Sequence, residues 1–170
     1  MIWTRGHKFD RECLPLADRH YNRRKVGSPQ FVPPGRSLVL KAEGALWVTS
    51  WPYAEYVRHA WAGAWMNSLF RHEGTMELAS ALIVAAVAAT RAEWPEVPAL
   101  GMVSFIDPLH VQPRKVHSRP TWGHCYFEAG VVHVGYTKGG LWVMQLRPEA
   151  MPEACAAETG QALLPFTEQG

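Results

Sequence analysis

Four segments of the chain carry apolar residues in patterns typical of β-strands. Residues 37–42 (SLVLKA) and 45–51 (ALWVTSW) are rich in β-branched and aromatic residues, and Glu43-Gly44 between them is a hairpin signal. Residues 131–137 (VVHVGYT) and 140–146 (GLWVMQL) alternate in the same way around a Gly-Gly turn. The pattern therefore predicts two hairpins. Two further apolar runs predict single strands at residues 64–73 and 102–106.

One long segment has the composition of a helix. Residues 75–94 contain helix formers almost throughout and no Gly or Pro, with Gly74 just before them and Pro95 just after. Two shorter helices are predicted at residues 9–21 and 120–129. The predicted order is helix, three strands, long helix, strand, short helix and two strands.

The length and hydrophobicity of the chain are those of a single globular domain. The chain has 170 residues, of which 48% are hydrophobic, which is enough to bury one core. We expect this domain to occupy residues 1–147. Residues 148–170 are predicted to form a loosely attached C-terminal extension.

Charge restricts any nucleic-acid role to local patches. The net charge is +2, which is too small for the whole surface to bind a polyanion. Two acid-free basic stretches, residues 19–25 and 110–119, are the candidates. Their phosphate ligands would be Arg23, Arg24, Lys25, Arg36, Arg114 and Lys115, with Phe31 and Trp122 as stacking surfaces. The alternatives are a solvated charged face and aromatic residues in the core.

Cysteine usage and hydropathy indicate a cytoplasmic protein. The three cysteines, Cys13, Cys125 and Cys155, are widely spaced and include no CxxC pair. The most apolar run, residues 78–89, is shorter than the roughly 20 residues that cross a bilayer, so no membrane role is expected. No histidine spacing predicts a metal site, and the need for a metal is left open.

The order of the predicted elements resembles that of the GCN5-related N-acetyltransferase (GNAT) superfamily. The resemblance implies an α/β (α+β) fold, with a mixed central sheet that is splayed at an acyl-donor cleft and flanked by helices. It also implies acetyl-CoA or a related acyl donor as the cofactor. Residues 1–147 would then be the catalytic domain.

A turn between the third strand and the long helix resembles the diphosphate-binding turn of that superfamily. Residues 71–76 (RHEGTM) contain the Arg-x-x-Gly of the pattern, although Met76 replaces its small last residue. Free N–H groups and the helix dipole favour anions at such a position. The resemblance implies that the acyl donor is bound by Arg71, His72, Gly74 and Thr75. The alternative is a helix that begins after a glycine, with a solvated arginine.

A tyrosine near the last helix resembles the general acid of the superfamily. Tyr126 stands four residues before Gly130 and would protonate the departing thiolate. The alternative is a tyrosine that packs in the core.

Five short motifs in the same order, together with a helix that ends at Trp94, resemble phage Mom-like DNA-modifying acyltransferases. They are HYNR (20–23), PPGR (33–36), FRHEG (70–74), GHCYFEAG (123–130) and GYTKGGL (135–141). The resemblance implies transfer of an acyl-derived or aminoacyl-derived group to an exocyclic amine of a DNA base, with adenine N6 as the first candidate. The partner would be double-stranded DNA or a locally flipped base, in the cytoplasm of a bacterial host cell. A homodimer is compatible with this interpretation.

Acyl transfer to an amine also requires a base. His20 is the first candidate, because neutral imidazole is available near pH 7 and the neighbouring cations disfavour its protonation. Tyr21 would face the reacting amine beside it. Glu73 and Asp107 are the competing bases, although Asp107-Pro108 is also a common turn. Asn67 would bind a substrate carbonyl or a base edge, or else lie on the outer face of a strand.

Two other functions are compatible with the same residues. One is a small-molecule or protein N-acetyltransferase that uses acetyl-CoA. The other is a non-catalytic nucleic-acid-binding module. Fold alone does not choose among the three.

Overall fold

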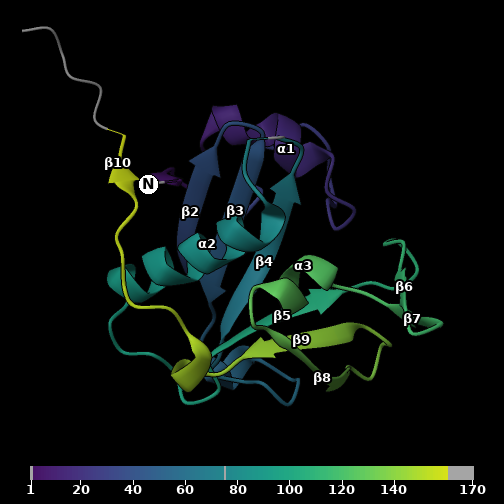
Figure 1. Ribbon diagram of the computed structural model, residues 1–170. Coiled ribbons are helices and arrows are strands. Elements are labelled where there is room, and N and C mark those ends of the chain that lie inside the picture. The colour runs from purple at the N-terminus through teal and green to yellow at the C-terminus, as the bar shows by residue number, and fades with distance from the viewer. Residues whose placement is uncertain (1, 75, 161–170) are drawn as a thin grey trace, which may run out of the picture.

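An eight-stranded mixed sheet dominates the computed structural model, which describes residues 2–74 and 76–160 (Figure 1). The strand order is β10-β1-β2-β3-β4-β5-β9-β8. The pairs β1–β10 and β4–β5 are parallel, and the others are antiparallel. The strands are β1 (Thr4–Arg5), β2 (Arg36–Ala42), β3 (Ala45–Trp51), β4 (Trp65–His72), β5 (Met102–Ile106), β8 (Val132–Tyr136), β9 (Trp142–Leu146) and β10 (Glu158–Thr159). A separate ribbon consists of β6 (Arg114–Val116) and β7 (Arg119–Thr121).

Helices are few and mostly short. Within the described residues, α2 (Ala79–Glu93) is the one α-helix longer than five residues, beside α1 (Leu14–Asp18) and α3 (His124–Glu128). Three 3-10 turns complete the set: η1 (Arg11–Cys13), η2 (Ala54–Tyr56) and η3 (Pro148–Ala150). None of the helices in this part of the chain has the length and apolar character needed to cross a bilayer.

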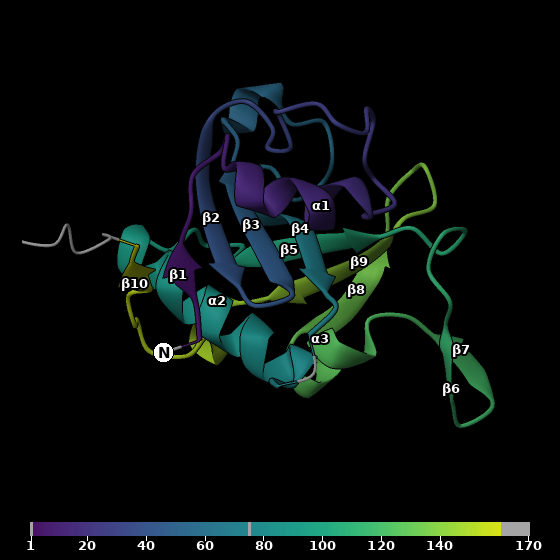
Figure 2. The same ribbon diagram turned by 90° about the horizontal axis from the view of Figure 1, so that it is seen from above.

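The expected α/β (α+β) fold of the GNAT type is wrong. Most of the regular structure is strand, and the sheet is not flanked by layers of helices. One face carries α2 and α3, whereas α1, a 3-10 turn and the irregular segment 19–35 cover the other (Figure 2). The resemblance to the GNAT superfamily had implied a central sheet flanked by helices.

Two hydrophobic clusters hold the sheet, one on each face. The larger includes Trp47, Trp65 and Val87 and packs α2 against β2, β3 and β4. The smaller joins Cys13 and Ala17 of the α1 side to residues of β2, β3 and β4. Burial of these side chains is the main favourable contribution to the free energy of folding, at about 25 cal/mol per Å² of apolar surface.

A fork in the sheet opens between β4 and β5. These parallel strands pair over three positions only, and the last pair is Asn67 with Ser104. Beyond it β4 continues to His72, and the two strands diverge (Figure 1). The fork lies at the carboxyl ends of the two parallel strands. Ligands commonly bind in a crevice at this edge of a sheet.

The strand predictions at residues 37–42, 45–51 and 102–106 are confirmed, the first with one more residue at its start. The helix predictions run too long. The long helix begins at Ala79 because Leu78 is extended, and helix 120–129 begins at His124 because residues 119–121 form β7. The helix expected over residues 9–21 is a 3-10 turn followed by five α-helical residues.

The described part of the C-terminal extension is firmly attached, contrary to expectation. Met151 is buried in the larger cluster, and β10 pairs with β1. The amide of Cys155 donates a hydrogen bond to the carbonyl of Ala88 at 3.0 Å. Residues 148–160 therefore belong to the sheet domain.

Candidate functional site

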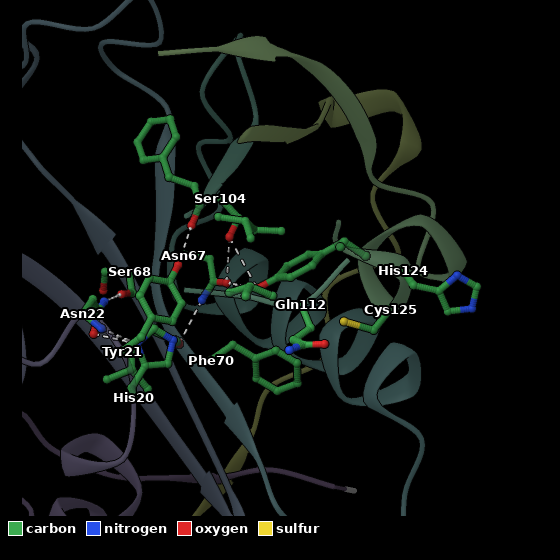
Figure 3. Close-up of a pocket in the computed structure, with 16 residues that line it drawn as sticks. His20, Tyr21, Asn22, Asn67, Ser68, Phe70, Ser104, Gln112, His124 and Cys125 are labelled. Carbon is green, nitrogen blue, oxygen red and sulfur yellow. Dashed lines mark hydrogen bonds between the residues drawn. The ribbon is translucent and has the colours of Figure 1, made fainter. Parts of the chain in front are cut away.

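A pocket of about 440 Å³ occupies the fork between β4 and β5. Its walls come from β4, β5 and α3, from residues 20–22 after α1, and from residues 111–112 before the ribbon. A volume of several hundred Å³ is typical of small-molecule sites. The pocket thus draws residues from both faces of the sheet (Figure 3).

Three buried polar side chains form the floor of the pocket: Asn67, Ser104 and Tyr126. The Tyr126 hydroxyl donates to Asn67 Oδ1 at 2.5 Å. The Ser104 hydroxyl lies 3.2 Å from the same oxygen and 3.3 Å from Tyr126 Oη, so its single proton has two acceptors within reach. The parallel register places Asn67 beside Ser104, and α3 brings Tyr126 to them.

The orientation of the Asn67 amide is fixed by the backbone of β3 and β4. Its Nδ2 donates to the carbonyls of Val48 at 3.2 Å and Leu69 at 2.9 Å. Two carbonyl acceptors can be served only by the amide nitrogen, so Oδ1 must face Tyr126 and Ser104. A β-bulge between β3 and β4 at Val48/Thr49 accompanies this arrangement.

The donors of the floor are all used within the protein. The hydroxyl protons of Tyr126 and Ser104 and both N–H groups of Asn67 have protein acceptors. Lone pairs on the hydroxyl oxygens of Tyr126 and Ser104 remain for a ligand. Burial raises the pKa of Tyr126 well above its usual range, so the phenol stays protonated. The floor therefore favours a ligand that donates an N–H.

Aromatic and polar groups of residues 20–22 form the opposite wall. Tyr21 Oη donates to the carbonyl of Phe105 and accepts from the amide of Asp107, each at 3.3 Å. Its ring stacks on His20 and on His110, with centroid distances of 4.6 and 5.9 Å. These contacts attach the end of the α1 segment to the end of β5.

His20 is half-buried and held by Asn22. Nδ1 of His20 lies 2.6 Å from Oδ1 of Asn22, whose Nδ2 donates to the carbonyl of Ser68 at 2.9 Å. Burial lowers the pKa of His20, and the nearby Arg71 lowers it further, whereas the Asn22 hydrogen bond raises it. The imidazole is therefore neutral near pH 7, and Nε2 has no hydrogen-bond partner among residues 2–74 and 76–160.

The remaining walls are largely apolar. Phe70, Phe105 and Ile106 line the pocket, as does the side chain of Cys125, whose sulfur points inward in Figure 3. Burial raises the pKa of the Cys125 thiol, which disfavours the reactive thiolate. A flat aromatic ligand with a polar edge suits a pocket of this kind.

Four of the predicted site residues meet in this pocket: His20, Tyr21, Asn67 and Tyr126. Two of the predicted bases do not. Glu73 is exposed and forms ion pairs with Arg19 and Arg71, which lower its pKa. Asp107 lies outside the pocket lining and pairs with His110 at 2.7 Å.

The predicted diphosphate-binding turn does not suit that ligand. The amides of Glu73 and Gly74 both donate to the carbonyl of Gly44, at 2.7 and 3.2 Å. Arg71 donates to Glu73 and to the backbone carbonyl of Arg19. Helix α2 begins five residues after Gly74, and neither Arg71 nor Gly74 lines the pocket. A glycine is required there because a Cβ on residue 74 would lie 2.9 Å from the Glu43 carbonyl.

His72 is the third residue predicted to bind the acyl donor, and it does not line the pocket either. His72 ends β4 and stacks on Phe70, with ring centroids 6.5 Å apart. Thr75 lies outside the described residues. We therefore assign no residue to a diphosphate.

Two predicted nucleic-acid contacts are structural residues instead. Arg23 is buried in an ion pair with Asp18 and donates to the carbonyls of Ser28 and Gln30. Phe31, which the Pro/Gly-rich loop had suggested to be exposed, is 8% exposed and packs in the smaller cluster.

The remaining predicted contacts lie on three different parts of the surface. Arg24 and Lys25 are exposed in the loop after α1. Arg36 lies over the ring of Trp51 at 4.0 Å. Arg114 and Lys115 are exposed on β6. Trp122 anchors the ribbon rather than offering a free stacking face, because its Nε1 donates to the carbonyl of Val111 at 2.8 Å.

Sequence patterns gave no signal for several residues of the site. Ser104 belongs to a segment predicted only as a buried strand, Gln112 belongs to no motif, and Cys125 lies in the motif GHCYFEAG without a predicted role. Their convergence depends on the parallel register of β4 and β5, which sequence periodicity does not encode. In the described part of the chain, no group of three or more His, Cys, Asp or Glu side chains is placed to hold a metal ion.

No protein-family model matches the chain, and the searches of curated proteins and of solved structures also returned no match.

Proposed function

We propose that the chain modifies DNA, by transferring an acyl-derived or aminoacyl-derived group to an exocyclic amine of a base held between β4 and β5. The observation that carries the proposal is the floor formed by Asn67, Ser104 and Tyr126, which offers acceptors and no free donor. An exocyclic amine of adenine, cytosine or guanine supplies the N–H that such a floor accepts.

A flipped base matches the pocket in shape as well as in polarity. Enzymes that react with a base take it out of the stack into a pocket with aromatic or apolar walls and hydrogen bonds to its edge. Phe70 and Phe105 supply such walls. Directly beside the pocket, the ribbon β6–β7 carries exposed cations that suit a phosphate backbone. The resemblance of the sequence motifs to phage Mom-like proteins supports the same substrate.

The chemistry assigns different roles to the two sides of the pocket. Tyr126 and Ser104 accept one N–H of the amine and thereby orient its nitrogen. The nitrogen forms a bond to the electrophilic carbon of an activated acyl donor, and the leaving group departs with the bonding electron pair. The neutral imidazole of His20 takes the proton that the nitrogen loses.

The acyl donor is defined only by its chemical class, an activated acyl or aminoacyl group. Since residues 71–74 do not suit a diphosphate, no step is assigned to coenzyme A. Tyr126 contacts the amine as an acceptor and is not assigned the role of general acid, because its proton is already donated to Asn67. Acting on DNA, the enzyme would work in the cytoplasm of a bacterial host cell.

Nucleoside mass spectrometry tests the proposal. DNA from cells that express the wild-type chain is expected to contain a new, heavier nucleoside. The His20→Gln and Tyr126→Phe variants are expected to reduce its amount by about 100-fold or more, the usual size of an acid–base or orientation effect. His7→Gln and Tyr136→Phe change exposed residues outside the pocket and serve as matched controls.

Three outcomes would contradict the proposal. They are an unchanged nucleoside profile with the wild-type chain, full product with His20→Gln and Tyr126→Phe, and a modified nucleoside found in RNA alone.

A further inference from the structure

The ribbon β6–β7 stands apart from the main sheet. Among the described residues its two strands pair only with each other, and five of their six residues are exposed. Figures 1 and 2 both show it projecting from the body of the molecule. The segments at its two ends, residues 111–112 and 123–126, line the pocket. The base of the ribbon therefore lies next to the pocket.

The ribbon is basic and has no acidic neighbour in the sequence. Its strands and turn contain Arg114, Lys115, His117 and Arg119, and no Asp or Glu occurs between Pro108 and Phe127. Within the described residues, none of the three cations Arg114, Lys115 and Arg119 forms an ion pair. Their charge is available to an anionic partner.

The register places both arginines on one face of the ribbon. Arg114 lies opposite Thr121, and Val116 lies opposite Arg119. Residues directly opposite in an antiparallel pair share a face, and alternate residues along a strand do too. One face thus carries Arg114, Val116, Arg119 and Thr121, and the other carries Lys115 and Pro120.

The ribbon has a fixed base and a tight tip. At the base, the Trp122 ring packs on Trp142, with centroids 5.2 Å apart, and its Nε1 donates to the Val111 carbonyl. At the tip, His117 and Ser118 have φ values of 49° and 64°. Two central residues with positive φ make the type of turn that matches the twist of a two-stranded ribbon.

We propose that this ribbon enters the major groove of duplex DNA beside the base that occupies the pocket. The proposal rests on the proposed function for that base. The major groove, about 12 Å wide, admits a two-stranded β-ribbon. The face with Arg114 and Arg119 points to the base edges, where guanidinium groups pair with guanine O6 and N7. Lys115 on the opposite face contacts the phosphate backbone.

Fluorescence anisotropy with a labelled mixed-sequence duplex tests the charge part of the proposal. The variant Arg114→Gln/Lys115→Gln/Arg119→Gln is expected to bind at least about tenfold more weakly than the wild type. Lys115→Gln alone is expected to reduce the slope of log K against log salt by about 0.9, the value for one phosphate contact. The control Lys8→Gln/Arg11→Gln/Arg147→Gln removes the same charge from exposed positions outside the ribbon and the pocket lining.

Dimethyl sulfate footprinting tests the groove, because the reagent methylates guanine N7 in the major groove. The wild type is expected to protect N7 of guanines at the binding site, and Arg114→Gln/Arg119→Gln is expected to lose that protection. Unchanged N7 reactivity with the wild type would overturn the groove assignment. Equal loss of affinity in the ribbon and control variants would overturn the role of the ribbon.

The two proposals fail in distinguishable ways. If the wild type makes no new nucleoside yet shows ribbon-dependent N7 protection, the transfer reaction is wrong and the ribbon assignment stands. If the nucleoside forms while the ribbon variants bind duplex DNA normally, the ribbon assignment is wrong.

Discussion

At the scale of the residue, Asn67 is the side chain on which the floor of the pocket depends. We predict that Asn67→Asp lowers the free energy of unfolding by about 2–4 kcal/mol, because the carbonyls of Val48 and Leu69 would lose their donors and face a buried carboxylate. Urea denaturation measures the change. Asn22→Asp is the matched control and should cost less than about 1 kcal/mol, since Asn22 is exposed. Equal effects of the two substitutions would contradict this account of Asn67.

His20 gives a prediction about pH. Burial, together with Arg71, lowers its pKa in the folded chain below the ordinary value of about 6.5. The folded state therefore favours the neutral imidazole, and stability contributed by His20 is lost as the pH falls from about 6.5 through the folded pKa. An NMR titration of the His20 ring should show the low pKa, and Arg71→Gln should raise it. A wild-type pKa at or above the ordinary value would refute the assignment of His20 as a neutral base.

At the scale of the element, the start of β5 has no room for a side chain. Gly101 has a φ of 69°, and a Cβ there would lie 2.0 Å from the carbonyl oxygen of Leu146 in β9. We predict that Gly101→Ala lowers the free energy of unfolding by at least about 2 kcal/mol and the melting temperature by roughly 4–8 °C. Gly139→Ala, where the nearest atom is 3.9 Å away, should change both values little. Calorimetry that found similar melting temperatures for the two variants would contradict this packing.

The strands of the main sheet were more predictable than its additions. Residues 45–51 and 102–106 are rich in β-branched and aromatic residues and are bounded by turn residues, which predicts strands. The structure has β3 and β5 at these positions. The ribbon was missed because Pro120 lies in β7 and its turn is His117-Ser118 rather than a glycine pair. The long helix was overextended because Met76, Glu77 and Leu78, which favour helices, precede α2 without belonging to it. The helix at residues 120–129 was overextended because Pro120 suits the first position of a helix, although it lies in β7.

At the scale of the whole molecule, the failure of the expected fold has a physical cause. The strands β1 and β10 have two residues each, too short for any periodicity, yet they extend the sheet and attach residues 148–160 to it. The candidate site was also only partly predictable from local sequence patterns. His20 and Tyr126 were predicted individually, but their meeting in one pocket requires contacts between segments about a hundred residues apart, which local patterns do not encode.

The central claim is that a DNA base enters the pocket between β4 and β5. Ultraviolet cross-linking of the wild-type chain to duplex DNA, followed by peptide mass spectrometry, locates the bases directly. Zero-length cross-links are predicted at Tyr21, Phe105, Cys125 or Tyr126, all of which line the pocket. Cross-links confined to the ribbon or to other surfaces, with none in residues 20–22, 104–106 or 123–126, would contradict the claim.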